Sequence, residues 1–463
     1  MSKFERSKKL VVLFDGTWCG RETGTETNVS LIAKAIGIPA SIAPTDTEPL
    51  TYEDPSRSLK ACYFPGIGLG GTFLDYLFDG ATANTIGEEC MKGYQYIVEN
   101  FDDDTDIWMF GLSRGSYTVR CIGGMINNCG IVKPLLTTDS TRRLVEEVYA
   151  IYRSPYDEDK PSHPSMQTFR AKASWQVNSP IAFLGIIDTV GSLGIPRLNA
   201  QAGGFDYPEF FSQDVSASVR RVYHACSMHD RLWAFQPCRA RRSATFEHKD
   251  DSDFSINERW FPGCHYDLGR QKFRFFRTGV NIVEKLLFSL PNALTTPVIP
   301  NAVCADLVLH WLFSSIAAND PANQILQRGA RASLTALETS MRGELTQGSG
   351  DVYGDMGKYA PAGFIGTAVS KMTSRASELA NSWMPNLQLV PAIQSFLGAK
   401  TILNILLATR DRRIQDVDAE LVDLQAPNAL LGGVTPWAKG GLERYQSETV
   451  RKWLLVRDIV RVD

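Results

Sequence analysis

Residues 111–115 read GLSRG and match the G-x-S-x-G pattern that surrounds many nucleophilic serines. An apolar, strand-like run precedes the motif, and a segment with helical spacing and small residues follows it. In a nucleophile elbow the serine occupies a strained turn between a strand and a helix, and the two glycines let neighbouring backbone approach closely. The helix N-terminus would add positive potential where an oxyanion forms. The pattern therefore predicts that Ser113 is the nucleophile of an acyl transfer, in preference to a glycine-rich turn with a capping serine.

A serine nucleophile on such a fold needs a histidine base later in the chain, after the end of a strand. The sequence has six histidines. His265 is the best candidate, because it lies in the glycine-containing loop PGCHYDLG after the last predicted strand. His229 also follows a strand and His224 lies within one, so both are weaker candidates. The others lie in a polar loop, a charged run and an apolar helical pattern: His163, His248 and His310.

The acid of such a site should also follow a strand. Asp188 closes the apolar run IAFLGII and begins DTVG, so its carboxylate should emerge at the same edge of the sheet as Ser113. Asp230 is the rival, since it follows the next strand. Asp267 lies too close in sequence to His265 to be an easy partner. A strand-terminal aspartate is often only a helix cap, which is the structural alternative for Asp188.

Two further glycine patterns concern the substrate side. Residues 66–71 satisfy G-x-G-x-x-G after a strand, but no acidic residue ends a second strand at the distance that a dinucleotide site requires. We interpret Gly66 and Gly68, with Asp15, as loops on the substrate side. The segment FDGT at residues 14–17 is similar to a phosphatase nucleophile loop, but Leu13 stands where the attacking aspartate would be needed.

The oxyanion would be held by backbone N–H groups. That of Arg114, the residue after the nucleophile, is the first, and the loop carrying Gly16 and Thr17 is expected to supply the second. The Arg114 side chain could instead hold a phosphate or form a structural ion pair. We expect no cofactor and no metal, because no cluster of ligands is visible in the sequence.

The elements that must position these residues alternate between strands and helices. Apolar runs that end in loop residues occur at residues 10–14, 60–64, 107–110, 181–187, 219–225 and 260–261, and helical patterns at 85–100 and 116–127 lie between them. This alternation predicts an α/β fold with a doubly wound, mostly parallel sheet. After about residue 285 helical patterns dominate. We expect a catalytic core at 1–285 and a helical C-terminal part at 286–463 that completes or caps it.

Composition excludes several classes of protein. The 463 residues carry 48 Lys plus Arg against 51 Asp plus Glu, and 44% are hydrophobic, so a large core is expected and nucleic acid is not an expected partner. The nine cysteines are scattered and none is at CxxC spacing, which is typical of a reducing compartment. With no signal peptide and no transmembrane pattern visible, the expected location is cytoplasmic, with peripheral membrane contact or signal-independent export as alternatives.

Six ordered segments resemble one known family, an α/β-hydrolase domain that includes the type VI secretion phospholipase effectors (Tle1-like) and occurs in bacteria and fungi. They are VVLFDGTW with Asn28 after it, YFPGIGLGG, FGLSRGSYTVR, FLGIIDTVGSLGIP, YHACSMHDR and WFPGCHYDLG, within residues 8–320. The resemblance implies an α/β-hydrolase fold, a Ser-Asp-His triad at Ser113, Asp188 and His265, and hydrolysis of lipid esters. This sequence departs from the family pattern at Leu112, Ser116 and Arg270, where Phe, Ala and Gly are usual.

Three functions follow from these residues. The first is a lipase or phospholipase, the second is a soluble carboxylesterase or thioesterase with a small acyl substrate, and the third is a binding module with an idle triad. The oligomeric state is not predicted. For the C-terminal part, residues 363–382 have the pattern of an interfacial helix that contacts lipid, whereas residues 390–406 fit core packing better.

Overall fold

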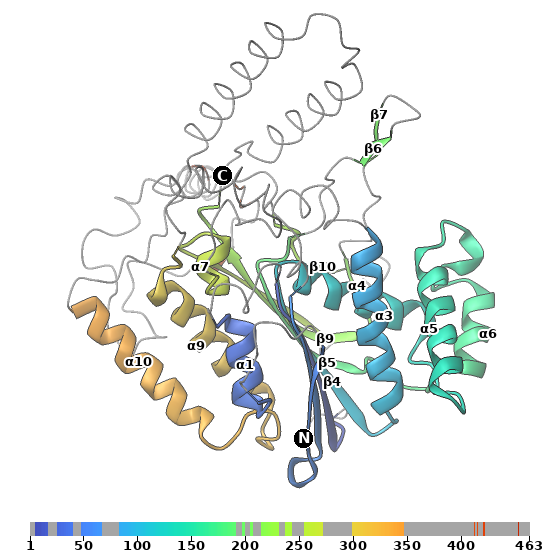
Figure 1. Ribbon diagram of the computed structural model, residues 1–463, viewed down its shortest axis with the longest axis horizontal. Coiled ribbons are helices and arrows are strands. Elements are labelled where there is room, and N and C mark those ends of the chain that lie inside the picture. Colours follow the sequence, from blue (N-terminus) through green and yellow to red (C-terminus); the bar gives the residue numbers. More distant parts are fainter. Residues whose placement is uncertain are drawn as a thin grey trace, which may run out of the picture.

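The computed structural model describes residues 5–16, 26–39, 48–66, 83–190, 197–199, 204–206, 214–230, 237–242, 254–271 and 299–346, together with Arg412, Ile414, Glu420–Leu421 and Lys452. Its centre is an eight-stranded sheet in the order β12-β11-β9-β5-β4-β1-β3-β2 (Figure 1). The strands are β1 (Lys8–Phe14), β2 (Leu50–Asp54), β3 (Leu59–Phe64), β4 (Thr105–Leu112), β5 (Ile181–Ile187), β9 (Val219–Ser227), β11 (Ser255–Phe261) and β12 (Glu420–Leu421).

All neighbouring strands in this sheet are parallel except the pair β2 and β3, which is antiparallel at one edge. The central strands β4 and β5 are buried along their whole length, as their continuous apolar sequences predict for a sheet covered on both faces. The predicted α/β-hydrolase architecture is therefore confirmed. The carboxyl ends of the parallel strands lie at one edge, called the carboxyl edge below, and their first residues define the amino edge.

Helices cover both faces of the sheet (Figure 1). One face packs against α1 (Asn28–Ile36), α9 (Ala302–Asn319) and α10 (Ala330–Thr346), and the other against α3 (Ala83–Asn100) and α4 (Arg114–Cys129). Strand β1 shows how one strand contributes side chains to both cores. Val11 and Leu13 enter the first core, whereas Leu10, Val12 and Phe14 enter the second, because successive side chains of a strand point to opposite faces.

The remaining elements lie outside the central sheet or are very short. They are η1 (Pro55–Arg57), α5 (Thr138–Arg153), η2 (Asp157–Asp159), α6 (Pro164–Ala173), β6 (Arg197–Asn199), β7 (Gly204–Asp206), β8 (Asp214–Val215), β10 (Arg241–Arg242) and α7 (His265–Gly269). The eight cysteines in the described residues are all buried, and none of them forms a disulfide bond with another.

Part of the C-terminal region belongs to the core. Helix α9 packs against the sheet, and β12 adds a parallel strand beside β11. Among the described helices, α9 alone is long and apolar enough to cross a membrane, and 72% of it is buried inside the protein, as in a core helix of a soluble domain. The division at residue 285 remains a prediction. The two segments at 363–382 and 390–406 lie outside the described residues.

Candidate active site

Ser113 lies at a strained turn between β4 and α4. Its backbone angles are φ 57° and ψ −117°, which a residue with a side chain rarely adopts. A Cβ at Gly111 would come within 2.5 Å of the Ser116 nitrogen, and one at Gly115 within 2.2 Å of the Phe14 carbonyl oxygen. Only glycine fits at these two positions, so the glycines of the motif allow the turn that a nucleophile elbow needs.

The elbow is tied to the neighbouring strand just before the candidate acid. The Ser113 N–H donates to the Ile187 carbonyl oxygen at 2.9 Å. The Ser116 hydroxyl donates to the same carbonyl at 3.0 Å, and the Ile187 N–H donates back to that hydroxyl at 3.1 Å. Ser116, which departs from the family pattern, therefore links α4 to the end of β5.

The structure brings Asp188 and His265 together. Asp188 follows β5 with φ 40°, and its Oδ2 lies 2.7 Å from Nδ1 of His265, the first residue of α7. The Ser227 N–H donates to the other carboxylate oxygen at 2.9 Å. Both side chains of the pair are buried. An imidazole that uses Nδ1 toward a carboxylate presents Nε2 for proton transfer elsewhere.

The rival acids have different partners. Oδ2 of Asp230 accepts the backbone N–H of His265 at 3.0 Å, so this carboxylate bonds the main chain that carries the imidazole. Asp267 accepts the N–H groups of Cys264 at 2.8 Å and Asn301 at 2.7 Å, and it thereby caps α7 and fixes the entry to α9. Asp188, in contrast, contacts the His265 ring itself.

The charge of Asp188 is stabilised despite complete burial. Burial favours the neutral acid, but the positive charge of Arg412 and the hydrogen bonds from His265 and Arg412 outweigh it, and they lower the pKa of Asp188 well below its usual range. Burial also raises the pKa of Asp230, and there it outweighs the lowering effects of Arg412 and His265. Asp188 is therefore an anion at neutral pH, as the acid of a triad must be.

A short helix presents His265, and its end depends on a residue that departs from the family pattern. Arg270 takes the left-handed conformation (φ 59°) that a glycine would adopt at a helix C-terminus. Its guanidinium compensates by donating to Asn28 at 3.1 Å and by pairing with Asp306. The Asn28 amide in turn donates to the carbonyls of Leu268 at 2.7 Å and Ala305 at 2.9 Å. The sequence singled out Asn28 only as part of a resemblance, and the structure gives it this anchoring role.

The loop after β1 lies against the elbow, since Gly115 sits on the carbonyls of Phe14 and Asp15. Asp15 is buried, and its carboxylate accepts bonds from the hydroxyls of Tyr63 at 2.5 Å and Thr27 at 2.6 Å and from the Gly16 N–H at 2.8 Å. Asp15 thus fixes the shape of this loop. In this structure the Gly16 N–H points to Asp15.

The remaining predicted site residues are only partly described. Gly66 follows β3 and is buried, whereas Thr17 and Gly68 lie outside the described residues. The Arg114 backbone begins α4, directly after Ser113.

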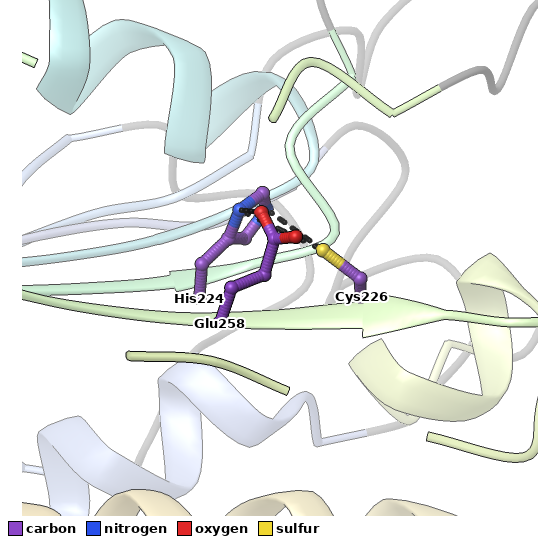
Figure 2. Close-up of side chains that lie close together, drawn as sticks. All are labelled: His224, Cys226 and Glu258. Carbon is purple, nitrogen blue, oxygen red and sulfur yellow. Dashed lines mark hydrogen bonds and ion pairs between the residues drawn. The ribbon is translucent and has the colours of Figure 1, made fainter. Parts of the chain in front are cut away.

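One group of side chains has the composition of a metal site. His224 and Cys226 on β9 and Glu258 on β11 point toward one another, and their ligand atoms lie within 4.8 Å of each other (Figure 2). The register pairs His224 with Glu258, which the separate sequence segments did not reveal. An H-x-C pattern on a strand was the signal available.

Hydrogen bonds already engage these three side chains. The Thr189 N–H points to Nε2 of His224 at 3.4 Å, Nδ1 lies 3.3 Å from Glu258, and Arg239 donates to Glu258 at 2.7 Å. Burial raises the pKa of Glu258, but the bonds from His224 and Arg239 lower it by more. The resulting pKa is about 2. Burial raises the pKa of the Cys226 thiol well above its usual value, so it is a poor metal ligand. Arg239 already pairs with the Glu258 carboxylate, and the donor set fits a structural bridge better.

The other histidines have roles outside the Asp188 pair. His163 caps α6 at the surface, and His310 on α9 contacts Glu338. His229 is buried beside the site, and burial followed by the charge of Arg412 lowers its pKa to about 3. His248 lies outside the described residues.

Comparison with known proteins identifies the family. Residues 8–286 match the model of the T6SS phospholipase effector Tle1-like catalytic domain, which is more than half of the chain. The chain belongs to this family. The predicted resemblance is confirmed, and membership supports lipase or phospholipase activity in general terms. Ser113, Asp188 and His265 all lie within the matched range.

Individual relatives are distant. The chain is 26% identical over 203 residues to an uncharacterized protein of Saccharomyces cerevisiae, YEL023C, and the match covers 40% of this chain and 28% of that protein. Among solved structures, a Tle1 effector bound to the VgrG spike of a type VI secretion system has 14% identity and a TM-score of 0.33, covering 75% of this chain and 81% of the other. An uncharacterized protein from Pseudomonas aeruginosa has 13% identity and a TM-score of 0.34, covering 88% and 65%.

Proposed function

We propose that this protein is a serine hydrolase that cleaves the acyl esters of lipids with Ser113, His265 and Asp188 as its triad. The observation that carries the proposal is the 2.7 Å bond between Asp188 and His265 at the carboxyl edge, where Ser113 stands on its strained turn. The order of the three residues along the chain is that of α/β-hydrolases.

In this mechanism Ser113 attacks the ester carbonyl carbon while Nε2 of His265 takes the hydroxyl proton. Asp188 accepts a hydrogen bond from the Nδ1–H group of His265, holds the ring in that tautomer and stabilises the imidazolium. His265 then returns the proton to the leaving alcohol, which leaves an acyl-serine. Water, deprotonated by His265, hydrolyses this intermediate and regenerates the enzyme.

The tetrahedral oxyanion needs N–H donors that are in place before the reaction. The Arg114 N–H begins α4, so the positive end of the helix dipole adds to its effect. The second donor would come from the loop of Asp15, Gly16 and Thr17, because Gly115 packs directly on the backbone of this loop. Use of the Gly16 N–H would require it to turn from Asp15 toward substrate.

The lipid substrate is supported by the family rather than by the geometry of the triad. A triad of this kind also serves a soluble carboxylesterase or thioesterase, so the substrate must be tested directly. Peripheral contact with a membrane is part of the proposal, because a lipase must reach aggregated substrate.

The test compares one enzyme on two physical forms of substrate. Purified protein should hydrolyse phospholipid in mixed micelles faster than a short-chain ester below its critical micelle concentration, with the Ser113→Ala variant as the blank. Hydrolysis confined to the monomeric ester would move the assignment to a soluble esterase. Equal rates for wild type and Ser113→Ala on both substrates would contradict catalysis by this site.

A further inference from the structure

Arg412 is completely buried against the candidate catalytic acid. Its Nη1 lies 2.6 Å from Oδ1 of Asp188, and its Nη2 lies 2.8 Å from Oδ2. Nη1 also donates to the Ser227 carbonyl at 2.8 Å. The guanidinium therefore bonds both oxygens of the carboxylate in the bidentate geometry that arginine favours.

Arg412 comes from the C-terminal region, beyond the matched range of residues 8–286. Two neighbouring features show that this region reaches the sheet. Ile414 is buried, and Glu420–Leu421 forms β12, which pairs with Arg259 and Trp260 of β11. The C-terminal region thus brings a cation to a site whose other described members lie in the first 286 residues.

We propose that Arg412 is a positioning residue that acts on catalysis through Asp188. It fixes the plane of the carboxylate so that Oδ2 faces His265, and it makes the C-terminal region a working part of the active site. This inference rests on the proposed function, because it assigns a role in the same reaction.

The geometry of the site explains why the Asp188 carboxylate needs Arg412 in addition to His265 and Ser227. Asp188 lies in an uncommon backbone conformation, and Oδ2 must receive Nδ1 of His265 while Oδ1 receives the Ser227 N–H. A carboxylate held on both oxygens by a planar fork cannot rotate away from the imidazole. Loss of such alignment costs catalysis even when every catalytic residue is present.

The charge of Arg412 has a second effect. It holds the completely buried Asp188 in its anionic form, because its positive charge opposes the effect of burial, which raises the pKa of Asp188. The other ionisable groups around the pair are Asp230, His229 and Cys226, which all interact electrostatically with Arg412. Removal of Arg412 should therefore move the acid limb of activity to higher pH.

The test uses two substitutions and a matched control on a soluble ester, so that lipid binding does not enter. Arg412→Met keeps the length of the side chain without its charge, and Arg412→Lys keeps the charge without the fork. Arg239→Met is the control, because Arg239 is a partly buried arginine that pairs with a different carboxylate, that of Glu258. Steady-state kcat and KM are measured from pH 5 to 9.

For Arg412→Met we expect kcat to fall by roughly 10²-fold with KM changed less than about 3-fold, because alignment rather than binding is lost. The midpoint of the acid limb of kcat/KM should move to higher pH, because the buried Asp188 carboxylate has lost its counter-ion. Arg412→Lys should restore the pH profile but only part of kcat, and Arg239→Met should change neither by more than a few-fold. An unchanged kcat and pH profile in Arg412→Met, or equal losses in the control, would overturn the proposal.

Wild type and Ser113→Ala are run in the same assay. Equal hydrolysis rates for these two proteins would contradict the proposed function. An active wild type together with an unchanged rate and pH profile for Arg412→Met would contradict only the role of Arg412. A second measurement tests the same coupling in case the Arg412→Met variant folds poorly. Arg412→Met should lower the melting temperature less in an Asp188→Asn background than in wild type. In that background there is no buried Asp188 carboxylate for the substitution to leave without its counter-ion. Equal decreases would show that the two side chains are not coupled and would overturn the proposal.

Discussion

Each edge of the central sheet buries one aspartate among cations. At the amino edge Asp106 is bound by Arg6 at 3.1 Å, by Lys9 at 3.0 Å and by Arg220. At the carboxyl edge Asp188 is bound by Arg412 and His265. Lysine and arginine keep their charge across the physiological range, whereas histidine can gain and lose a proton there. The amino edge is therefore a cluster of fixed charges, whereas the carboxyl edge carries a side chain of the type that the proposed mechanism needs for proton transfer.

The backbone differs between the edges as well. Asp106 and its partners Lys9 and Arg220 lie at the starts of regular strands, and none of the three has a positive φ. Ser113 and Asp188 follow the ends of β4 and β5, and both have a positive φ. Strained backbone at two adjacent strand ends is typical of an active site. Substitutions at the two edges should therefore differ in their effects on activity and stability.

The largest effect should come from the nucleophile. Ser113→Ala removes the attacking oxygen and should reduce turnover by about 10⁴- to 10⁶-fold, since members of a triad act as a unit. His265→Ala should be equally inactive, whereas His229→Ala should be milder. Turnover on a chromogenic ester and a thermal melt are measured for each variant. Residual activity of Ser113→Ala above about a tenth of wild type would exclude Ser113 as the nucleophile.

The next effect distinguishes the two candidate acids. Asp188→Asn should reduce turnover by roughly 10⁴-fold, because an amide cannot hold His265 in the required tautomer. Asp230→Asn should cost far less, since Asp230 bonds the His265 backbone and not the ring. Both rates are measured at pH 8. A greater loss from Asp230→Asn would move the acid to the residue after β9.

At the amino edge we expect lost stability without lost chemistry. Asp106→Asn leaves Lys9 and Arg220 buried without their counter-ion and should lower the free energy of unfolding by about 3–5 kcal/mol. Turnover of the folded protein should stay within a few-fold of wild type. Asp104→Asn, at an exposed neighbouring position, is the control for denaturant unfolding. If Asp106→Asn inactivates a protein that melts normally, the separation between the edges fails.

A smaller, pH-dependent effect is expected from His229. Its pKa is about 3 in the folded protein and about 6.5 in the unfolded chain, so below pH 6.5 the unfolded state binds the extra proton. Stability should therefore fall from about pH 6.5 toward pH 3, by about 2 kcal/mol at pH 5 from this group. His229→Gln should make the melting temperature depend less on pH in this range, and His163→Gln at the surface should not. Parallel curves for all three proteins would remove His229 as the cause.

Much of the fold was predictable because its signals are local. Continuous apolar runs predicted the buried strands, and the glycines around Ser113 predicted the turn that the structure shows. Chain order narrowed the acid and the base to a few residues. The choice between Asp188 and Asp230 depends on where each carboxylate points after its strand, which a sequence pattern does not encode.

Contacts between distant segments were not predictable. Arg412 is 224 residues from Asp188 and stands in no recognisable motif. The approach of His224 to Glu258 depends on the register of β9 against β11. The bonds that Asn28 makes to the ends of α7 and α9 depend on how α1 packs. Each of these requires the assembled sheet, because the partners are adjacent only in space.

The most direct test of Ser113 as an activated nucleophile is to map the adduct of a fluorophosphonate probe on the purified wild-type protein by peptide mass spectrometry. This probe reacts with serines activated as nucleophiles. We expect one modified peptide, with the adduct on Ser113, and no labelling when His265 is replaced by alanine. An unlabelled wild-type protein, or an adduct on another serine, would contradict it.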